Sequence, residues 1–290
     1  MIVRRPFAST TDASIRRLSD LKDRLDHQNV VAASGITIQD VDDAAGLWRQ
    51  IDNLSQSRVN LDAFLTNGEF AESILRVADV ALQEGADVLS SARALAVYLS
   101  NDSFVPSDRS AQLPEVEQMI ESIVQIGNAQ YGKRFVFAGT AYDSAAFDEG
   151  GTYLGTNDVP STQVSDTQFV NTGFDGSVAI ESALAALQDF ANALQSGDQA
   201  QVNAQIDVLD EAFRDLVLQR QQVGHEQSDV GRINDLTRSL QITVAESLDQ
   251  LVGQDPIEAL TSLSELQSAY QIALQVTATR SSNTIFDFLR

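Results

Sequence analysis

The segment "SGITIQDVDDAAGLW", residues Ser34–Trp48, interrupts a chain that otherwise has the pattern of continuous helix. Its first two residues, Ser34 and Gly35, are a turn signal. Asp42 or Asp43 can begin the next helix, because a carboxylate there accepts a hydrogen bond from a free backbone N–H and suits the positive end of the helix dipole. The segment therefore predicts a joint between a terminal helix and a longer one.

Apolar residues with helical spacing flank this joint on both sides. Before it, Leu18, Leu21 and Leu25 recur at steps of three and four residues, the spacing of one apolar helix face. After it, the same spacing resumes at Ala44 and continues to about Ser100. Two glycines inside this stretch each cost a helix about 1 kcal/mol relative to Ala and mark places where it can kink.

The middle of the chain has a different character. Residues 101–110 are predicted as a loop, and a helix follows in which Pro114 suits the first turn. A strand is predicted near residues 135–137, where aromatic residues alternate with Val. Glycine and proline then divide residues 141–178 into short β-prone pieces, which predict a small insert rich in β-hairpins.

Helix is predicted again from about Ser182, with a short break at residues 196–198 and a long apolar seam after it. A second break at residues 253–256 precedes a last helix, in which Pro256 suits the first position. The order of elements before the insert is thus mirrored after it.

This layout predicts a mainly α protein. Long antiparallel helical rods would form a coiled-coil-like bundle, with the N- and C-termini paired and a small β-rich insert in the middle. We expect three parts: a terminal helical (inner core) domain of residues 1–40 and 252–290, a helical rod domain of residues 41–138 and 180–251, and an outer insert of residues 139–179.

Charge and composition exclude several classes of function. The formal net charge is −22, and residues 135–213 hold twelve Asp and Glu but no Lys or Arg. Such a surface repels phosphate and anionic lipid, so we expect neither nucleic acid nor membrane as a partner. With no cysteine, the chain has no disulfide and no thiolate metal site. No apolar run is long enough to span a membrane, and the N-terminus lacks the apolar core of a secretory signal peptide.

The terminal helices have dilute apolar seams. Polar residues such as Thr11, Ser14, Gln267 and Ser281 stand where apolar ones would pack best. We expect these helices to become ordered when copies stack, because only then is enough apolar surface buried. The candidate assembly residues are Phe7, Leu18, Leu21, Leu25, Leu263, Tyr270, Leu274, Ile285, Phe286, Phe288 and Leu289. The candidate loop or hinge residues are Ser34, Gly35, Ile38, Asp42, Asp43 and Gly46.

The opening segment resembles a loop of the bacterial flagellin family, in which SG, an Ile and then DD-A-A-G lead into a long helix. Further segments resemble the same family in the same order: "SARALAVYLSND", "NAQYGKRFVFAGT", "VGHEQSDVGRINDL", "QDPIEALTSLSELQSAYQIAL" and "TIFDFLR". The small insert, "FVFAGT" and "IFDFLR" resemble the hook-associated junction members more than flagellin itself. One departure is Thr37-Ile38-Gln39, which stands where the family usually has RIN.

The resemblance implies an extracellular structural protein of the bacterial flagellum, at the junction between hook and filament. It implies export through the flagellar type III apparatus, without a cleaved signal peptide. The implied partners are identical subunits in a ring, another hook-associated protein on the hook side and flagellin on the filament side. Before secretion, an export chaperone would hold the C-terminal helix. No cofactor and no enzymatic activity are implied.

Three acidic residues and two histidines could suggest a metal site or a catalytic base. Asp40, Asp42 and Asp43 lack the glycine and distal Glu of a calcium loop, so helix capping is the better interpretation. His27 and His225 have no second ligand four residues away and fit surface or seam positions better than a metal site or a base. Two other functions stay open: a short flagellin that forms the filament itself, and a soluble coiled-coil adaptor or secreted effector.

Overall fold

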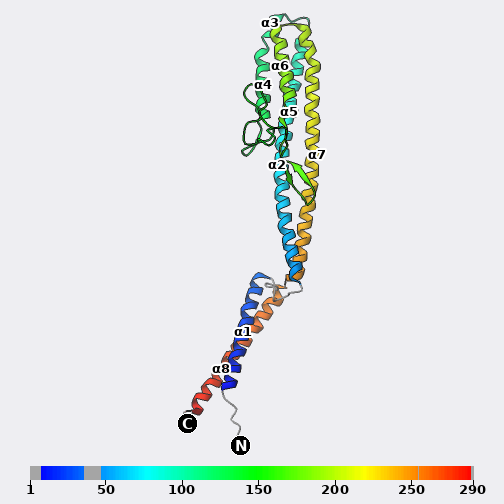
Figure 1. Cartoon of the computed structure of the whole chain (residues 1–290). Coiled ribbons are helices and arrows are strands. Elements are labelled where there is room, and N and C mark those ends of the chain that lie inside the picture. The colour runs from blue at the N-terminus through cyan, green and yellow to red at the C-terminus, as the bar shows by residue number, and fades with distance from the viewer. Residues whose placement is uncertain (1–7, 36–46, 254, 289–290) are drawn as a thin grey trace. The chain divides into compact units, whose positions relative to one another are not determined.

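The computed structural model describes residues 8–35, 47–253 and 255–288, and the side chains of all of these except residues 8–12, 179, 256 and 280–288. The helices are α1 (Ala8–Ser34), α2 (Trp48–Leu99), α3 (Pro106–Ser110), α4 (Leu113–Gly127), α5 (Gly176–Ala179), α6 (Glu181–Ser196), α7 (Gln199–Val252) and α8 (Pro256–Phe288). The strands are β1 (Gln130–Tyr131), β2 (Arg134–Phe135), β3 (Ser161–Gln163) and β4 (Phe169–Asn171). The predicted mainly α fold, with paired terminal helices, is confirmed (Figure 1).

The chain divides into two compact units. Residues 1–58 and 242–290 form one, called here the terminal unit, and residues 59–241 form the other, called the rod unit. The division falls within α2 and α7, so both long helices contribute to both units. The three-part division expected from the sequence stays a prediction.

The rod unit has one apolar core, built from α2, α4, α6 and α7 (Figure 1). Leu89 of α2 and Leu216 of α7 are fully buried in it, as is Phe190 of α6. Phe137 and Phe147, which lie between the helices in sequence, are buried in the same core. The irregular middle of the chain is therefore attached to the helices by large aromatic side chains.

The long helix α2 runs unbroken through both of its glycines, Gly68 and Gly85. Both are buried where another helix comes close. A Cβ atom built on Gly68 would lie 1.9 Å from Oδ1 of Asn234 in α7, and one on Gly85 would lie 3.2 Å from a methyl of Leu216. At Gly68, the glycine permits a close approach of two helices rather than a kink.

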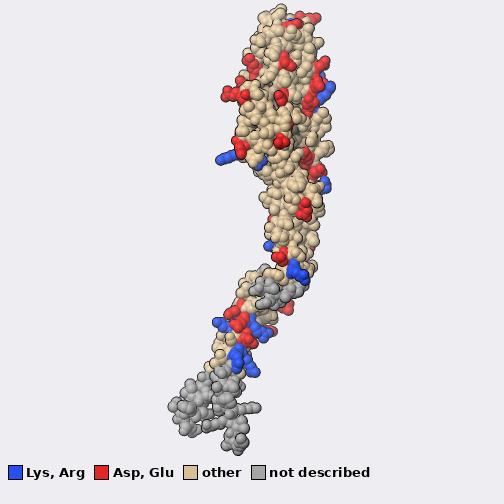
Figure 2. All heavy atoms as spheres, in the orientation of Figure 1, with Lys and Arg blue, Asp and Glu red and all other residues tan. Residues whose placement is uncertain are grey.

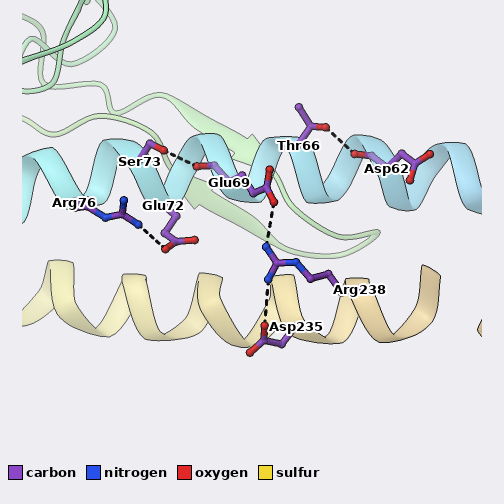
Figure 3. Close-up of polar contacts among 8 residues, drawn as sticks. All are labelled: Asp62, Thr66, Glu69, Glu72, Ser73, Arg76, Asp235 and Arg238. Atoms are coloured by element: carbon purple, nitrogen blue, oxygen red, sulfur yellow. Dashed lines mark hydrogen bonds and ion pairs between the residues drawn. The ribbon is translucent and has the colours of Figure 1, made fainter. Parts of the chain in front are cut away.

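Polar contacts join α2 to α7 along the edges of this seam. Figure 3 shows Arg238 of α7 between Glu69 of α2, at 3.1 Å, and Asp235 of its own helix, at 3.2 Å. Further along, Arg220 of α7 pairs with Asp79 of α2 at 2.8 Å. These pairs are partly exposed, so each contributes little free energy but helps to fix the register of the two helices.

The breaks predicted from the sequence have the expected local chemistry. Helix α1 ends at Ser34, and Gly35 follows with a φ of +72°, its N–H bonded to the carbonyl oxygen of Val31 at 2.7 Å. Gly197 ends α6 in the same way, with a φ of +68°. This left-handed residue after a helix is a favoured position for glycine. At the start of α8, Asp255 accepts a hydrogen bond from the N–H of Ile257 at 2.8 Å.

The prediction of a loop over residues 101–110 is wrong in its second half. Residues Pro106–Ser110 form the short helix α3. Pro106 stands at its first position, and Asp108 accepts a hydrogen bond from the N–H of Val105 at 3.2 Å. Local capping therefore makes a turn of helix in a segment too short to show any apolar periodicity.

The two β-hairpins are small. Strands β1 and β2 pair antiparallel around a two-residue loop that begins with Gly132, whose φ is +64°. Strands β3 and β4 pair antiparallel in the stretch that was predicted to be rich in hairpins. Asn67 of α2 donates to the carbonyl oxygen of Gln163 at 2.8 Å and Asn171 donates to Glu226 of α7 at 3.4 Å, so this hairpin is fastened to both long helices.

Candidate functional site

The candidate site is the pair formed by α1 and α8, called here the terminal helix pair. The two helices pack against each other. Among their described side chains, residues 13–34 and 257–279, only Val31 and Ala259 are fully buried. Gln28 donates a hydrogen bond to the carbonyl oxygen of Ala259 at 3.2 Å, close to these two residues. The pair thus has a contact line but hardly any core.

The structure places the predicted assembly residues in three groups. Leu18, Leu21, Leu25, Leu263 and Tyr270 are half-buried, whereas Leu274 is exposed. Ile285, Phe286 and Phe288 belong to the helical backbone of α8, but their side chains lie outside the described residues. Phe7 and Leu289 also lie outside the described part of the chain. Of the loop residues, Ser34 and Gly35 are described, while Ile38, Asp42, Asp43 and Gly46 are not.

The terminal helix pair exposes six apolar side chains in addition to Leu274 of the predicted set. These are Ile15, Val30, Ile257, Leu260, Ile272 and Val276, with Ile257 reaching 76% exposure. The predicted assembly set does not contain these six residues. The signal on α8 was a second apolar spacing, in which Ile272 and Val276 are four residues apart.

The rod unit is more acidic than the terminal unit, as the sequence suggested. Residues 59–241 carry 27 acidic and 9 basic side chains, whereas residues 1–58 and 242–290 together carry 14 acidic and 10 basic ones. Figure 2 shows blue and red side chains interspersed over the described terminal helices, and mostly red ones over the rod unit. The terminal helices can therefore approach other protein with less like-charge repulsion than the rod unit can.

The perturbed ionisable groups of the described residues have structural roles. Burial raises the pKa of Tyr153 to about 12. Its hydroxyl donates to the carbonyl oxygen of Thr156 at 2.9 Å and accepts from the N–H of Gly176 at 3.3 Å, which pins two loops together. Burial also raises the pKa of Glu226, beneath the β3–β4 hairpin. Both groups hold the insert in place.

Within the described residues, no group of three or more His, Asp or Glu side chains is placed to hold a metal ion. His27 and His225 are both exposed, as the surface interpretation predicted. In the same part of the chain, no helix has the length and apolarity that crossing a membrane requires.

Part of the chain is similar in sequence to bacterial flagellins. Residues 10–142, just under half of the chain, match the family model of the bacterial flagellin N-terminal helical region. A flagellin of Clostridium tyrobutyricum is 37% identical over 98 residues, which make up 33% of this chain. That alignment spans only 26% of the length of the flagellin. The chain is similar to bacterial flagellins over this helical region.

Solved structures narrow the fold further. A flagellar hook-associated protein of Vibrio parahaemolyticus aligns with a TM-score of 0.65 and 18% identity, covering 73% of this chain and 100% of that one. FlgL of Bacillus cereus aligns with a TM-score of 0.59 and 17% identity, covering 69% of this chain and 100% of that one. Hook-associated protein-3 of Legionella pneumophila aligns with a TM-score of 0.63 and 11% identity, covering 69% of this chain and 98% of that one. The chain has the fold of the flagellar hook-associated proteins, as the resemblance of its segments predicted.

Proposed function

We propose that this chain is the structural subunit that joins hook and filament in the bacterial flagellum, and that its terminal helices order fully by packing against neighbouring subunits. The observation that carries the proposal is the thin packing of α1 against α8, which leaves seven large apolar side chains exposed. Fully burying one such side chain contributes about 1.5–3 kcal/mol. Covering several of them in an assembly therefore supplies free energy on the scale that folds a domain.

The partners follow from this role. Identical subunits would form a ring, with another hook-associated protein on the hook side and flagellin on the filament side. A cytoplasmic export chaperone would cover the apolar face of α8 until secretion through the flagellar export apparatus, without a cleaved signal peptide. The mature protein would stand at the hook–filament junction outside the cell and act as a building block rather than as an enzyme. The expected hinge and assembly residues are part of this proposal.

Deleting residues Ile285–Arg290 tests the role of the C-terminal end. We expect the truncated protein to keep the helical content and the thermal transition of the rod unit, because the core of that unit lies entirely within residues 59–241. It should not be incorporated at the hook tip, which immunogold labelling of purified hook–basal bodies would show. Labelling of the full chain at the junction and normal incorporation of the truncated protein would together refute the contact role of this end.

A short flagellin is the second candidate, favoured by the flagellin match over residues 10–142. Seeded polymerisation separates the two. A purified flagellin adds to filament seeds and grows long filaments, whereas a junction subunit adds a limited number of copies and stops. Continuous growth of this protein on seeds of itself would favour the flagellin assignment.

A further inference from the structure

We propose that residues 224–237 of α7, called here the soft segment, open locally while the facing part of α2 stays helical. The structure shows the closed form, in which the segment is helical, and opening is a transient departure from it. The two long helices of the rod unit then have different mechanical roles: α2 is the continuous support, and α7 is the helix that yields. The inference concerns the single chain and does not rest on the proposed assembly role.

Two glycines inside the soft segment have no packing role. A Cβ atom built on Gly224 or on Gly231 would meet nothing within 4 Å among the described residues. Each glycine nevertheless shifts the equilibrium away from helix about fivefold relative to Ala. The glycines of α2 differ, because Cβ atoms on Gly68 and Gly85 would press against side chains of α7. Glycine permits close packing in α2, whereas in this part of α7 it only weakens the helix.

The seam of α7 that faces the core turns polar where the soft segment lies. At a spacing of seven residues, this seam begins with Ile206 and Phe213, both packed against the core. It continues with Arg220, Gln227 and Asn234, which are polar. A polar seam gains less free energy from packing than an apolar one. The soft segment is therefore held less firmly than the part of α7 that precedes it.

Asn234 gives the soft segment a buried polar group that gains from opening. It is 1% exposed, and neither polar atom of its amide has a hydrogen-bond partner among the described residues. Such a group costs free energy while it is buried, and water satisfies it when the segment opens. The apolar side chains that the soft segment buries are those of Val230 and Ile233, whereas residues 202–216 bury four. Opening of the soft segment therefore exposes little apolar surface.

The structure leaves room beside the soft segment. A groove of about 370 Å³ lies between α7 and the β3–β4 hairpin. Glu226, Asp229 and Ile233 line it on α7, and residues 167–171 line it on the hairpin. Figure 1 shows this hairpin beside the same part of α7. The side chains on this face of the segment therefore have space into which they can shift.

Contacts with α2 lie on both sides of the soft segment. Before it, Arg220 pairs with Asp79 of α2 at 2.8 Å. After it, Arg238 pairs with a carboxylate of α2 at 3.1 Å. Within it, the ion pair that Arg232 forms is with Asp229 of its own helix. Both ends of the segment are tied to α2, so an opening that starts between them need not spread to the rest of the rod unit.

Amide hydrogen exchange of the full-length chain, followed by mass spectrometry, tests this inference. In the regime where the rate reports the opening equilibrium, we expect the soft segment to exchange at least about tenfold faster than residues 68–79 of α2, which face it. The variant G224A/G231A should slow exchange of the soft segment by about tenfold or more, because each Ala favours the helix. Exchange of residues 68–79 should stay the same.

The variant N203A is the matched control for the glycine pair. Asn203 is an exposed residue of α7 outside the soft segment, and Ala is a better helix former than Asn as well as than Gly. N203A should therefore leave exchange of the soft segment unchanged. The single variants G224A and G231A should each slow that exchange by about fivefold.

Slower exchange confined to the soft segment, with no effect of N203A, would establish the inference. Equal protection of the soft segment and of residues 68–79 in the natural chain would overturn it. So would a G224A/G231A variant that slows both segments equally, because the rod unit would then open as one. A glycine variant without effect, or an N203A variant that slows the soft segment as much, would also contradict it.

Discussion

Arg109 is a buried guanidinium whose hydrogen-bond partners are all backbone carbonyl oxygens. It donates to Leu99 at 3.0 Å, to Asn101 at 3.1 Å and to Gly197 at 3.4 Å. The first two carbonyls lie at the end of α2 and the third just after α6, where the helix dipoles are negative. One side chain of α3 therefore ties together the ends of two other helices.

Replacing this residue should be costly. We expect Arg109→Met to lower the free energy of unfolding by about 2–3 kcal/mol, because buried carbonyl groups lose charged donors. Urea denaturation followed by circular dichroism would measure the loss. Arg93→Met is the control, since Arg93 is largely exposed and pairs with Asp210 at the surface, and its loss should stay below about 1 kcal/mol. Equal losses in the two variants would contradict the role of Arg109 in tying the ends of two helices together.

Gly68 and Asn234 make a second prediction about single residues. Gly-to-Ala changes inside a helix usually stabilise it by about 1 kcal/mol. Here we expect Gly68→Ala to destabilise, because its Cβ would meet the Asn234 amide, which is buried and has no hydrogen-bond partner among the described residues. Asn234→Ala should remove the penalty in the double variant, as a double-mutant cycle in urea would show.

Gly224→Ala in α7 is the matched control for this cycle, since a Cβ there would meet nothing within 4 Å. It should stabilise the protein by about 0.5–1 kcal/mol. A Gly68→Ala variant as stable as Gly224→Ala would show that the two helices can separate slightly without cost.

At the scale of elements, the β3–β4 hairpin should respond to pH through Glu226. Its pKa is raised, mainly because burial disfavours the charged carboxylate, while hydrogen bonds from Gln222 and Asn171 act in the opposite direction. Stability linked to this group is therefore fully present below the ordinary value of 4.5 and is lost as pH rises through the folded-state pKa.

The variant Glu226→Gln removes that linkage. The variant should be slightly more stable than the natural chain at pH 7. The stabilities of the two proteins should become equal as pH falls to about 4.5. Thermal unfolding across this pH range would test it, with Glu211→Gln as an exposed control on the same helix. A constant difference at every pH would indicate a packing effect and contradict the titration.

Much of the fold could be predicted at this scale, because apolar spacing carries over many turns in α2 and α7. The breaks at Gly35, Gly197 and Asp255 could also be predicted, because a glycine after a helix and a carboxylate before one are local signals. The short helix α3 was not, since five residues are too few for periodicity and a capping carboxylate decides it. The burial of Phe137 and Phe147 could not be predicted, because it depends on which segments meet in space.

For the whole molecule, the prediction concerns order that depends on assembly. In dilute solution, amides of residues 1–30 and 260–290 should exchange with solvent much faster than those of the rod unit, because the terminal helix pair buries so few side chains. Hydrogen exchange with mass spectrometry would measure this before and after incorporation, when protection should appear. Full protection of these segments in the isolated monomer would instead favour a coiled-coil adaptor or effector.

Helices α2 and α7 both cross from the rod unit into the terminal unit without a break. Towards the terminal unit, the last buried residues are Gly68 of α2 and Thr237 of α7. Fraying that begins in the terminal unit would therefore meet its first packed layer there. Every monomer would then bring the same fixed length of folded helix to an assembly, whatever the state of its ends.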